Sequence, residues 1–307
     1  MTLAQANSAA VVELLNTYMN YARTDGIDLI GVAAIRKHDE TQDACASDVA
    51  GNPNLLGALK EGLGILQTKV KGKLASWAPP EDELVVSLIE KIKPNTMVAW
   101  DGLVSLIDQA RFCEENGIEG AFVELGCWKG GALGAMALAN MEWGKKRRDL
   151  HGFDSFQGLP MPRADKDDMP WASVLGISAS QCDGSLRPAR ATLLEASQMD
   201  VERLFVRLGY PLDHIYLRAG WFQDTVPAAW MDIDKIAILR LDGDLYDSYA
   251  LSLDCLYDLV VPGGFVIFDD WDLKGCREAV GDFFSRRGIR AYLSQVDYSI
   301  RFLQKAA

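Results

Sequence analysis

The chain has 307 residues, enough to bury a full α/β core and to carry a smaller appendage. Its 43 acidic and 31 basic residues give a formal net charge of −12, which disfavours nucleic acid or an anionic membrane as the main partner. No apolar run approaches the roughly 18 residues that a membrane span requires, and the start lacks the basic segment of a secretion signal. We therefore expect a cytoplasmic protein that acts on a small molecule.

The six cysteines are dispersed, with no CxxC pair and no histidine close by. This distribution is typical of reduced thiols rather than of a disulfide framework or a zinc site. The three histidines, His38, His151 and His214, do not cluster either, and we expect each of them to be a surface or structural residue.

The first 95 residues differ in pattern from the rest of the chain. Apolar residues recur at helical spacing over residues 11–19 and 55–74, and two prolines precede a third predicted helix at residues 81–92. None of these segments carries a chemical signature. We predict a helical extension over residues 1–95 that serves as a cap or dimerisation arm, and we expect a homo-oligomer.

From residue 96 onward, helical and extended patterns alternate, beginning with a predicted helix over residues 101–116. Strands are predicted at five apolar runs: 121–125, 150–153, 215–217, 236–241 and 265–268. A helix over residues 277–287 precedes two short runs, 290–294 and 299–303, whose small separation forces an antiparallel hairpin. The pattern predicts a doubly wound α/β fold, a parallel sheet finished by an antiparallel hairpin.

The stretch from Lys235 to Trp271 holds the largest group of candidate functional residues, which are acids at the ends of two predicted strands. Its first strand ends in DGD (residues 242–244), a helical pattern with one apolar face follows as far as Val260, and PGG at 262–264 ends that helix. Its second strand ends in DD (residues 269–270). A strand–helix–strand unit places the carboxyl ends of two parallel strands at one edge, about 4.8 Å apart when they are neighbours. We expect these acids to crowd into one small space.

Carboxylates at this separation repel one another, and protonation, basic partners or a bound cation relieve the repulsion. No Lys or Arg lies within three residues of Asp269 and Asp270, and we expect Arg240 to point away from Asp242. An all-oxygen set without His or Cys suits Mg²⁺ or a similar hard cation. We predict a metal site, because open α/β sheets bind ligands at this edge.

Two other interpretations of these acids remain open. They could be exposed loop residues, with Asp244, Asp247 or Ser248 capping the following helix. The DxD at residues 242–244 is also similar to the motif with which metal-dependent glycosyltransferases hold Mn²⁺ and a nucleotide diphosphate. That alternative leaves the second acid pair and the glycine turn of the first strand unexplained.

The turn after the first predicted strand reads ELGCWKGG, where a nucleotide-binding turn belongs. In the fingerprint G-x-G-x-x-G the second glycine admits a pyrophosphate, which Trp128 would obstruct here, and the absence of GK[ST] excludes a P-loop. Glu124 and Asp154 lie at the ends of the first two strands. Asp154 could accept hydrogen bonds from the two ribose hydroxyls of an adenosine ligand without phosphates, and Glu124 suits a cationic charge on that ligand. S-adenosylmethionine meets each requirement, although Gly126 and Gly130 could merely permit a tight turn.

Six runs in the same order, VELGCWKGG, FDSFQGLP, GWFQDTVP, LRLDGDLYDS, PGGFVIFDDW and GCREAV, resemble the macrocin O-methyltransferase (TylF/MycF-like) family. Characterised members methylate sugar hydroxyls of macrolide and aminocoumarin antibiotics with S-adenosylmethionine and Mg²⁺. The resemblance spans about Thr96 to Phe302 and implies a Rossmann-like class I methyltransferase domain over residues 96–307. It also implies that the extension helps to select the acceptor. Residues 161–191 match poorly, and a lid or a variable loop is expected there.

The resemblance implies individual roles. The residues implied to hold or cover the cofactor are Thr96, Met97, Glu124, Gly126, Asp154, Ser155, Gly220, Trp221 and Phe222. Trp128 and Gly130 of the glycine turn are predicted to join them, whereas Trp221 and Phe222 could instead be core aromatics. Asp242, Asp269 and Asp270 match the metal ligands.

The predicted chemistry is O-methylation of a vicinal diol. A cation held by the aspartates, Asp242 among them, would chelate two neighbouring hydroxyls of the acceptor and lower the pKa of the reacting one. Asp244, two residues further on, is the candidate base. The acceptor is expected to be a sugar on a natural product, with a catechol or another phenol as the alternative. A non-enzymatic binding role would require these acids to be dispensable.

Overall fold

The computed structural model describes residues 83–169, 172, 177–186, 188 and 196–306. Residues 82–307 form one compact unit, separate from residues 1–81. The helices predicted over residues 11–19 and 55–74, and with them the predicted cap or dimerisation arm, lie outside the described residues.

The core of this unit is a seven-stranded sheet in the order β3-β2-β1-β4-β5-β7-β6. Its strands are β1 (Ala121–Leu125), β2 (Leu150–Asp154), β3 (Ile215–Ala219), β4 (Ile236–Leu241), β5 (Val260–Phe268), β6 (Ser294–Gln295) and β7 (Arg301–Gln304). The first five are parallel, whereas β7 runs antiparallel to both β5 and β6. The predicted doubly wound α/β fold with a terminal antiparallel hairpin is confirmed.

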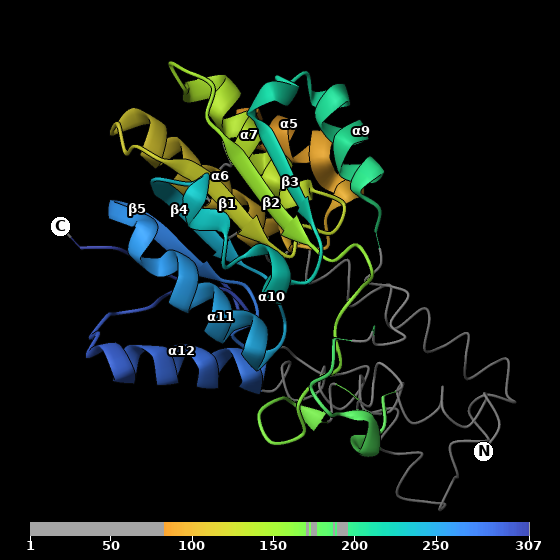
Figure 1. Cartoon of the computed structure of the whole chain (residues 1–307). Helices are drawn as coiled ribbons and strands as arrows, with labels where there is room; N and C mark the ends of the chain where they lie inside the picture. The colour runs from red at the N-terminus through yellow and green to blue at the C-terminus, as the bar shows by residue number, and fades with distance from the viewer. Residues whose placement is uncertain (1–82, 170–171, 173–176, 187, 189–195, 307) are drawn as a thin grey trace, which may run out of the picture. The chain divides into compact units, whose positions relative to one another are not determined.

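Helices cover both faces of the sheet (Figure 1). One face packs against α5 (Glu83–Ile92), α6 (Trp100–Glu115), α7 (Gly131–Trp143) and α9 (Gln198–Leu208). The other packs against α10 (Phe222–Thr225), α11 (Tyr246–Leu256) and α12 (Lys274–Arg287). Strand residues alternate between these layers, so Phe122 belongs to the first core cluster and its neighbour Val123 to the second. The 3₁₀ turns are η1 (Lys93–Asn95), η2 (Ala179–Gln181), η4 (Leu212–His214), η5 (Ala229–Met231) and η6 (Tyr257–Leu259).

Several element boundaries differ from the sequence prediction. The helix expected to continue to Val260 ends at Leu256, and β5 begins at Val260 instead of Phe265. Backbone pairing with the end of the chain explains the longer strand, because the N–H of Gly263 donates to the carbonyl oxygen of Lys305 at 2.7 Å. β6 has only two residues.

Helix α5, which falls within the predicted extension, is part of the sheet domain. Its buried face consists of Val85, Leu88, Ile89 and Ile92. These side chains belong to the same core cluster as α6 and α7. The apolar stripe read from residues 81–92 therefore packs within the domain that carries the sheet.

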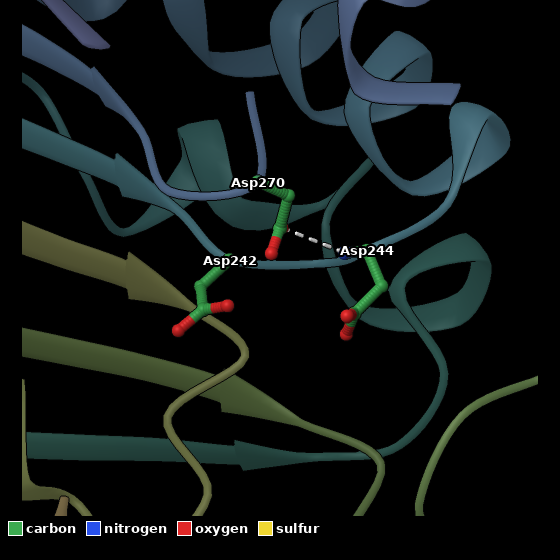
Figure 2. A group of neighbouring side chains, drawn as sticks. All are labelled: Asp242, Asp244 and Asp270. Carbon is green, nitrogen blue, oxygen red and sulfur yellow. Dashed lines mark hydrogen bonds between the residues drawn. The ribbon is translucent and has the colours of Figure 1, made fainter. Parts of the chain in front are cut away.

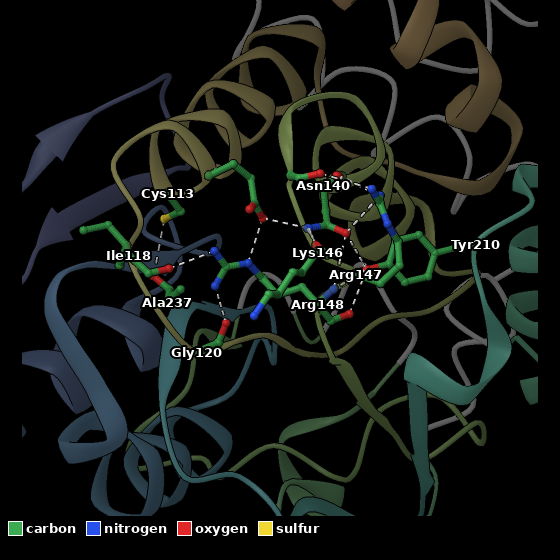
Figure 3. Close-up of polar contacts among 11 residues, drawn as sticks. Cys113, Ile118, Gly120, Asn140, Lys146, Arg147, Arg148, Tyr210 and Ala237 are labelled. Carbon is green, nitrogen blue, oxygen red and sulfur yellow. Dashed lines mark hydrogen bonds and ion pairs between the residues drawn. The ribbon is translucent and has the colours of Figure 1, made fainter.

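A buried polar network joins the amino ends of the strands (Figure 3). The Arg148 guanidinium forms an ion pair with Glu114 at 2.7 Å and donates to the carbonyl oxygens of Ile118 and Gly120. Asn140 donates to Glu114 at 2.9 Å, and the hydroxyl of Tyr210 lies 2.8 Å from the Asn140 side-chain oxygen. These bonds tie α6, α7 and the segment after α9 to the edge opposite the expected site.

Candidate active site at the carboxyl edge of the sheet

A cavity of about 250 Å³ lies at the carboxyl ends of β1, β2, β4 and β5. It occupies the point where the strand order reverses between β1 and β4, where open α/β sheets bind their ligands. The predicted site residues that line it are Thr96, Met97, Glu124, Gly126, Trp128, Asp154, Ser155, Trp221, Phe222, Asp242, Asp244, Asp269 and Asp270. Gly130 and Gly220 do not line it: Gly130 is the N-cap of α7, and Gly220 donates its N–H to the Asp154 carbonyl oxygen.

The glycine turn passes directly over the end of β4. Gly126 has φ +86°, and a Cβ atom built there would lie 1.7 Å from the carbonyl oxygen of Asp242, so only glycine fits. This contact brings the turn after β1 against the first residue of the acidic loop. The glycine turn and Asp242 therefore lie side by side at the cavity.

Asp154 shapes both turns beside the cavity. Its Oδ2 accepts the N–H of Trp128 at 2.8 Å, and its Oδ1 accepts the N–H of Phe156 at 2.7 Å. Both donors have left-handed backbones, with φ 45° at Trp128 and 53° at Phe156. Burial raises the pKa of Asp154, and these two backbone hydrogen bonds oppose the shift. Asp154 thus supports two strained turns, a role that the sequence prediction missed.

The other predicted cofactor residues that line the cavity come from separate segments of the chain. Thr96 accepts the N–H of Val98 through Oγ1 at 3.0 Å, and Met97 is 60% exposed at the cavity. Ser155 donates to the carbonyl oxygen of Gly158 at 2.7 Å, which closes the turn after β2. Of the two aromatics, Phe222 both lines the cavity and packs against the second core cluster.

Arg240 corrects the prediction made for it, because it points toward Asp242 and not away. Its Nη1 lies 2.5 Å from Oε1 of Glu124 and 2.8 Å from Oδ2 of Asp242, and its Nη2 lies 2.5 Å from Oδ1 of Asp269. Residues two apart in a strand face the same side of the sheet, and this periodicity puts Arg240 beside the acid that follows the strand. Glu124 pairs directly with Arg240 in the sheet register.

The single positive charge of Arg240 does not balance the three carboxylates around it, those of Glu124, Asp242 and Asp269. Glu124 and Arg240 are almost fully buried, each with a side-chain exposure of 2%. Burial raises the pKa of Glu124 to about 7 and that of Asp269 to about 7, although Arg240 opposes both shifts. Oε2 of Glu124 and Nε1 of Trp128 are buried at the cavity without a protein hydrogen-bond partner. Unpaired buried groups of this kind are rare in folded proteins and require an explanation.

Three aspartates gather at the far end of the cavity. Asp242, Asp244 and Asp270 each offer a carboxylate oxygen, and these oxygens lie within 4.8 Å of one another (Figure 2). Oδ2 of Asp270 accepts the backbone N–H of Asp244 at 2.9 Å and the hydroxyl of Tyr249 at 2.8 Å. Asp269, predicted as a ligand, lies in the ion pair with Arg240 and outside this group.

The loop that carries Asp244 is strained. Asp244 has φ 58°, a left-handed conformation that is uncommon outside glycine and is enriched at functional sites. Burial raises the pKa of Asp244 well above its usual range, and the neighbouring charge of Asp242 adds to the shift. The helix-capping alternative is wrong for Asp244. The N-cap residue of α11 is Leu245, and its side chain makes no capping hydrogen bond.

The histidines stay outside this site. His151 is buried in β2, where its Nδ1 lies 2.8 Å from Nη1 of Arg218, and burial lowers its pKa to about 4. His214 lies in the 3₁₀ turn before β3, with its Nδ1 2.7 Å from Asp149. Both are structural residues, as expected, whereas His38 lies outside the described residues. The five cysteines in the part of the chain that the structure describes are free.

The family of this chain follows from comparison with known proteins. The model of the macrocin O-methyltransferase (TylF) family matches residues 93–305. The chain belongs to this family. It is therefore a methyltransferase, and the glycosyltransferase alternative is wrong.

Named relatives agree with this family. A tetracenomycin enzyme of Streptomyces olivaceus, "8-demethyl-8-(2,3-dimethoxy-alpha-L-rhamnosyl)-tetracenomycin-C 4'-O-methyltransferase", is 33% identical over 62% of this chain and 69% of its own length. The mycinamicin III 3''-O-methyltransferase of Micromonospora griseorubida is 31% identical over 66% of this chain and 75% of its own. The solved structure of the O-methyltransferase NovP superposes with a TM-score of 0.60 at 29% identity, covering 69% of this chain and 83% of that one.

The methyltransferase domain is a Rossmann-like sheet, and the cavity lies at its carboxyl edge, where open α/β sheets bind their ligands. In the part of the chain that the structure describes, no helix combines the length and the apolar character needed to cross a bilayer.

Proposed function

We propose that this macrocin O-methyltransferase family member transfers the methyl group of S-adenosylmethionine to a sugar hydroxyl of a natural product, assisted by Mg²⁺ or a similar divalent cation. The observation that carries the proposal is the shared cavity. The strained glycine turn with Glu124 and Asp154 forms one part of it, and the aspartates that follow β4 and β5 form another.

The first part of the cavity suits S-adenosylmethionine, which supplies an electrophilic methyl group on a sulfonium. The buried Oε2 of Glu124 is an unpaired acceptor for a cationic ligand, and the buried Nε1 of Trp128 is an unpaired donor for a carboxylate. Asp154 retains lone pairs for ribose hydroxyls beyond its two backbone bonds. Thr96 and Met97 are proposed to cover the cofactor, with Ser155 and the region of Gly220, Trp221 and Phe222 beside it.

The second part suits a hard cation. Among the described residues that line the cavity, six are carboxylates and only Arg240 is basic, so the excess of negative charge in the ionised state is large. Oxygen donors of this kind are the ligands that Mg²⁺ prefers. A divalent cation bound there supplies Lewis acidity, which makes a nearby hydroxyl easier to deprotonate.

We propose Asp242, Asp269 and Asp270 as the residues that hold the cation. Asp269 meets Arg240 through Oδ1, which leaves Oδ2 for the cation. Asp244 is then proposed as the base that accepts the proton of the acceptor hydroxyl, because its carboxylate lies beside those of the proposed ligands Asp242 and Asp270. Its position in the observed cluster makes direct ligation by Asp244 the competing arrangement.

Two variants separate these roles. Titration of Mn²⁺ into Asp244→Asn should give the affinity of the unmodified protein if Asp244 is the base, whereas Asp269→Asn should bind Mn²⁺ more weakly. A loss of Mn²⁺ affinity in Asp244→Asn, with Asp269→Asn unaffected, would assign Asp244 to the ligands in place of Asp269.

The acceptor is proposed from the relatives, one of which is named for a rhamnosyl substrate. The test is to incubate the protein with S-adenosylmethionine, Mg²⁺ and either mycinamicin III or demethyldecarbamoylnovobiocin, followed by mass spectrometry. The expected result is gain of one methyl group on a sugar. Methylation of a catechol probe, with none of any glycoside in a wider panel, would favour the phenol alternative and overturn the sugar assignment.

A further inference from the structure

The segment after β2 reaches across to the two helices that follow the acidic loops. Arg163 forms an ion pair with Asp247 at 3.0 Å, and Lys166 lies 3.2 Å from Asp282 and 4.3 Å from the centre of the Tyr246 ring. These contacts are exposed and contribute little individually. They place the described part of this segment against α11 and α12.

At the centre of this docking lies Asp167, whose carboxylate is buried with only 4% exposure of the residue. Oδ2 accepts the N–H of Arg163 in its own segment at 2.7 Å. Oδ1 accepts the N–H of Tyr246, the first residue of α11, at 2.8 Å. Asp167 therefore caps a helix from a distant part of the sequence, in place of the neighbouring residues that normally do so.

The same carboxylate contacts the first turn of α12. A Cβ atom built on Gly275, the second residue of that helix, would lie 2.3 Å from Oδ1 of Asp167. The N-terminal ends of both helices favour a negative charge at this position, whereas burial raises the pKa of Asp167 and opposes it. These helices follow the two loops that carry the aspartates of the candidate site.

A short chain of contacts leads from Asp167 to those aspartates. Asp167 holds the N–H of Tyr246, and two residues earlier the N–H of Asp244 donates to Oδ2 of Asp270 at 2.9 Å. The backbone of this turn thus orients the Asp270 carboxylate. A shift of the turn would misplace Asp270 and Asp244 together.

We propose that Asp167 is a positioning residue for the cation-binding aspartates, acting through the amino ends of α11 and α12. The inference rests on the proposed function, since it assigns Asp167 a role in the same site. Asp167 itself does not line the cavity.

Two independent variants test this inference. Asp167→Asn removes the charge and leaves one carbonyl oxygen for two N–H donors. Gly275→Ala keeps the charge but introduces a methyl group where Oδ1 of Asp167 lies. Two variants serve as matched controls. Asp165→Asn changes an exposed acid of the same segment. Gly281→Ala adds a methyl group in α12 at a position where the space around it is open.

Binding of Mn²⁺ is measured by electron paramagnetic resonance with S-adenosylhomocysteine present, and binding of S-adenosylhomocysteine by calorimetry. Asp167→Asn and Gly275→Ala should each weaken Mn²⁺ binding about tenfold while S-adenosylhomocysteine affinity changes less than about twofold, given that a lost cap shifts a helix end locally. Both controls should bind as the unmodified protein does.

The inference is overturned if Asp167→Asn and Gly275→Ala bind Mn²⁺ normally. It is also overturned if they lose Mn²⁺ and S-adenosylhomocysteine in equal measure, which would indicate a purely structural role. Failure of the unmodified protein to bind Mn²⁺ would instead overturn the proposed cation site, and this inference with it.

Discussion

The two edges of the sheet both carry buried charged groups, but these groups are paired differently at each edge. At the amino edge, Arg148 is matched by Glu114 and by backbone carbonyl oxygens, and Asn140 and Tyr210 complete the network (Figure 3). At the carboxyl edge, Arg240 faces several carboxylates at once. A satisfied buried network stabilises a fold, whereas unpaired buried groups cost stability.

Backbone strain follows the same division. In the described part of the chain, the non-glycine residues with left-handed backbones are Trp128, Phe156 and Asp244. They lie in the turns after β1, β2 and β4, all at the carboxyl edge. Strain of this kind persists only where surrounding contacts enforce it, here largely through Asp154 and Asp270. The candidate site and the satisfied polar network therefore lie at opposite edges of one sheet.

The largest effect should come from the carboxyl edge. Asp242→Asn should lower turnover about a thousandfold, roughly 4 kcal/mol of transition-state stabilisation, because it removes a proposed ligand of the cation. The fold should persist, since the substitution also relieves repulsion between carboxylates. Methyl transfer and S-adenosylhomocysteine affinity are the measurements. Unchanged turnover would reject the metal assignment.

Substitutions at the amino edge should change the stability of the protein and leave ligand binding unchanged. Arg148→Met leaves Glu114 buried without its cation and should lower the free energy of unfolding by about 3 kcal/mol. Urea denaturation measures this loss, and S-adenosylhomocysteine affinity of the folded variant should stay unchanged. Lys235→Met, which breaks an exposed pair with Glu119 near the same edge, is the control, and its free energy of unfolding should hardly change. Equal losses in both variants would contradict the comparison.

His151 adds a pH dependence to that stability. Its pKa of about 4 in the folded protein lies below the ordinary value of 6.5, because burial and Arg218 disfavour the charged ring. The unfolded chain therefore binds the proton first, and the stabilisation is complete above pH 6.5 and lost as the pH falls toward 4. The loss should be about 3 kcal/mol. Urea denaturation across this range should be flatter in His151→Gln, and identical profiles would disprove the assignment.

The smallest effect is expected at Tyr210. Its hydroxyl lies 2.7 Å from the carbonyl oxygen of Arg148, and Tyr210→Phe should cost about 1 kcal/mol of unfolding free energy. Tyr292→Phe, at a ring that is 86% exposed, should change nothing. A neutral Tyr210→Phe would mean that this network does not stabilise the amino edge.

Local patterns were enough to predict much of the fold. The runs at 121–125 and 236–241 match β1 and β4, because each is a fully buried strand bounded by turn residues. The start of β5 was missed, since Val260 pairs with Ile236 of β4 and Gly263 with Lys305 near the end of the chain, contacts that have no local signal. β6 was predicted too long for a similar reason, as only two of its residues pair with β7.

The residues of the candidate site could be predicted where their position follows from the strand topology alone. The acids at the carboxyl ends of β1, β2, β4 and β5 converge because parallel strands end at one edge. Arg240 was misplaced although strand periodicity and its register with Glu124 could have revealed it. Asp167 was beyond reach, because its role depends on a long segment docking across the ends of two helices.

The most direct test is a crystal grown with S-adenosylhomocysteine and Mn²⁺, measured for anomalous scattering. We expect a peak between the carboxylates of Asp242 and Asp270, with the cofactor seated on the turn at Gly126. No peak at that position, with these carboxylates turned toward solvent and S-adenosylhomocysteine bound elsewhere or absent, would contradict the proposed methyl-transfer site.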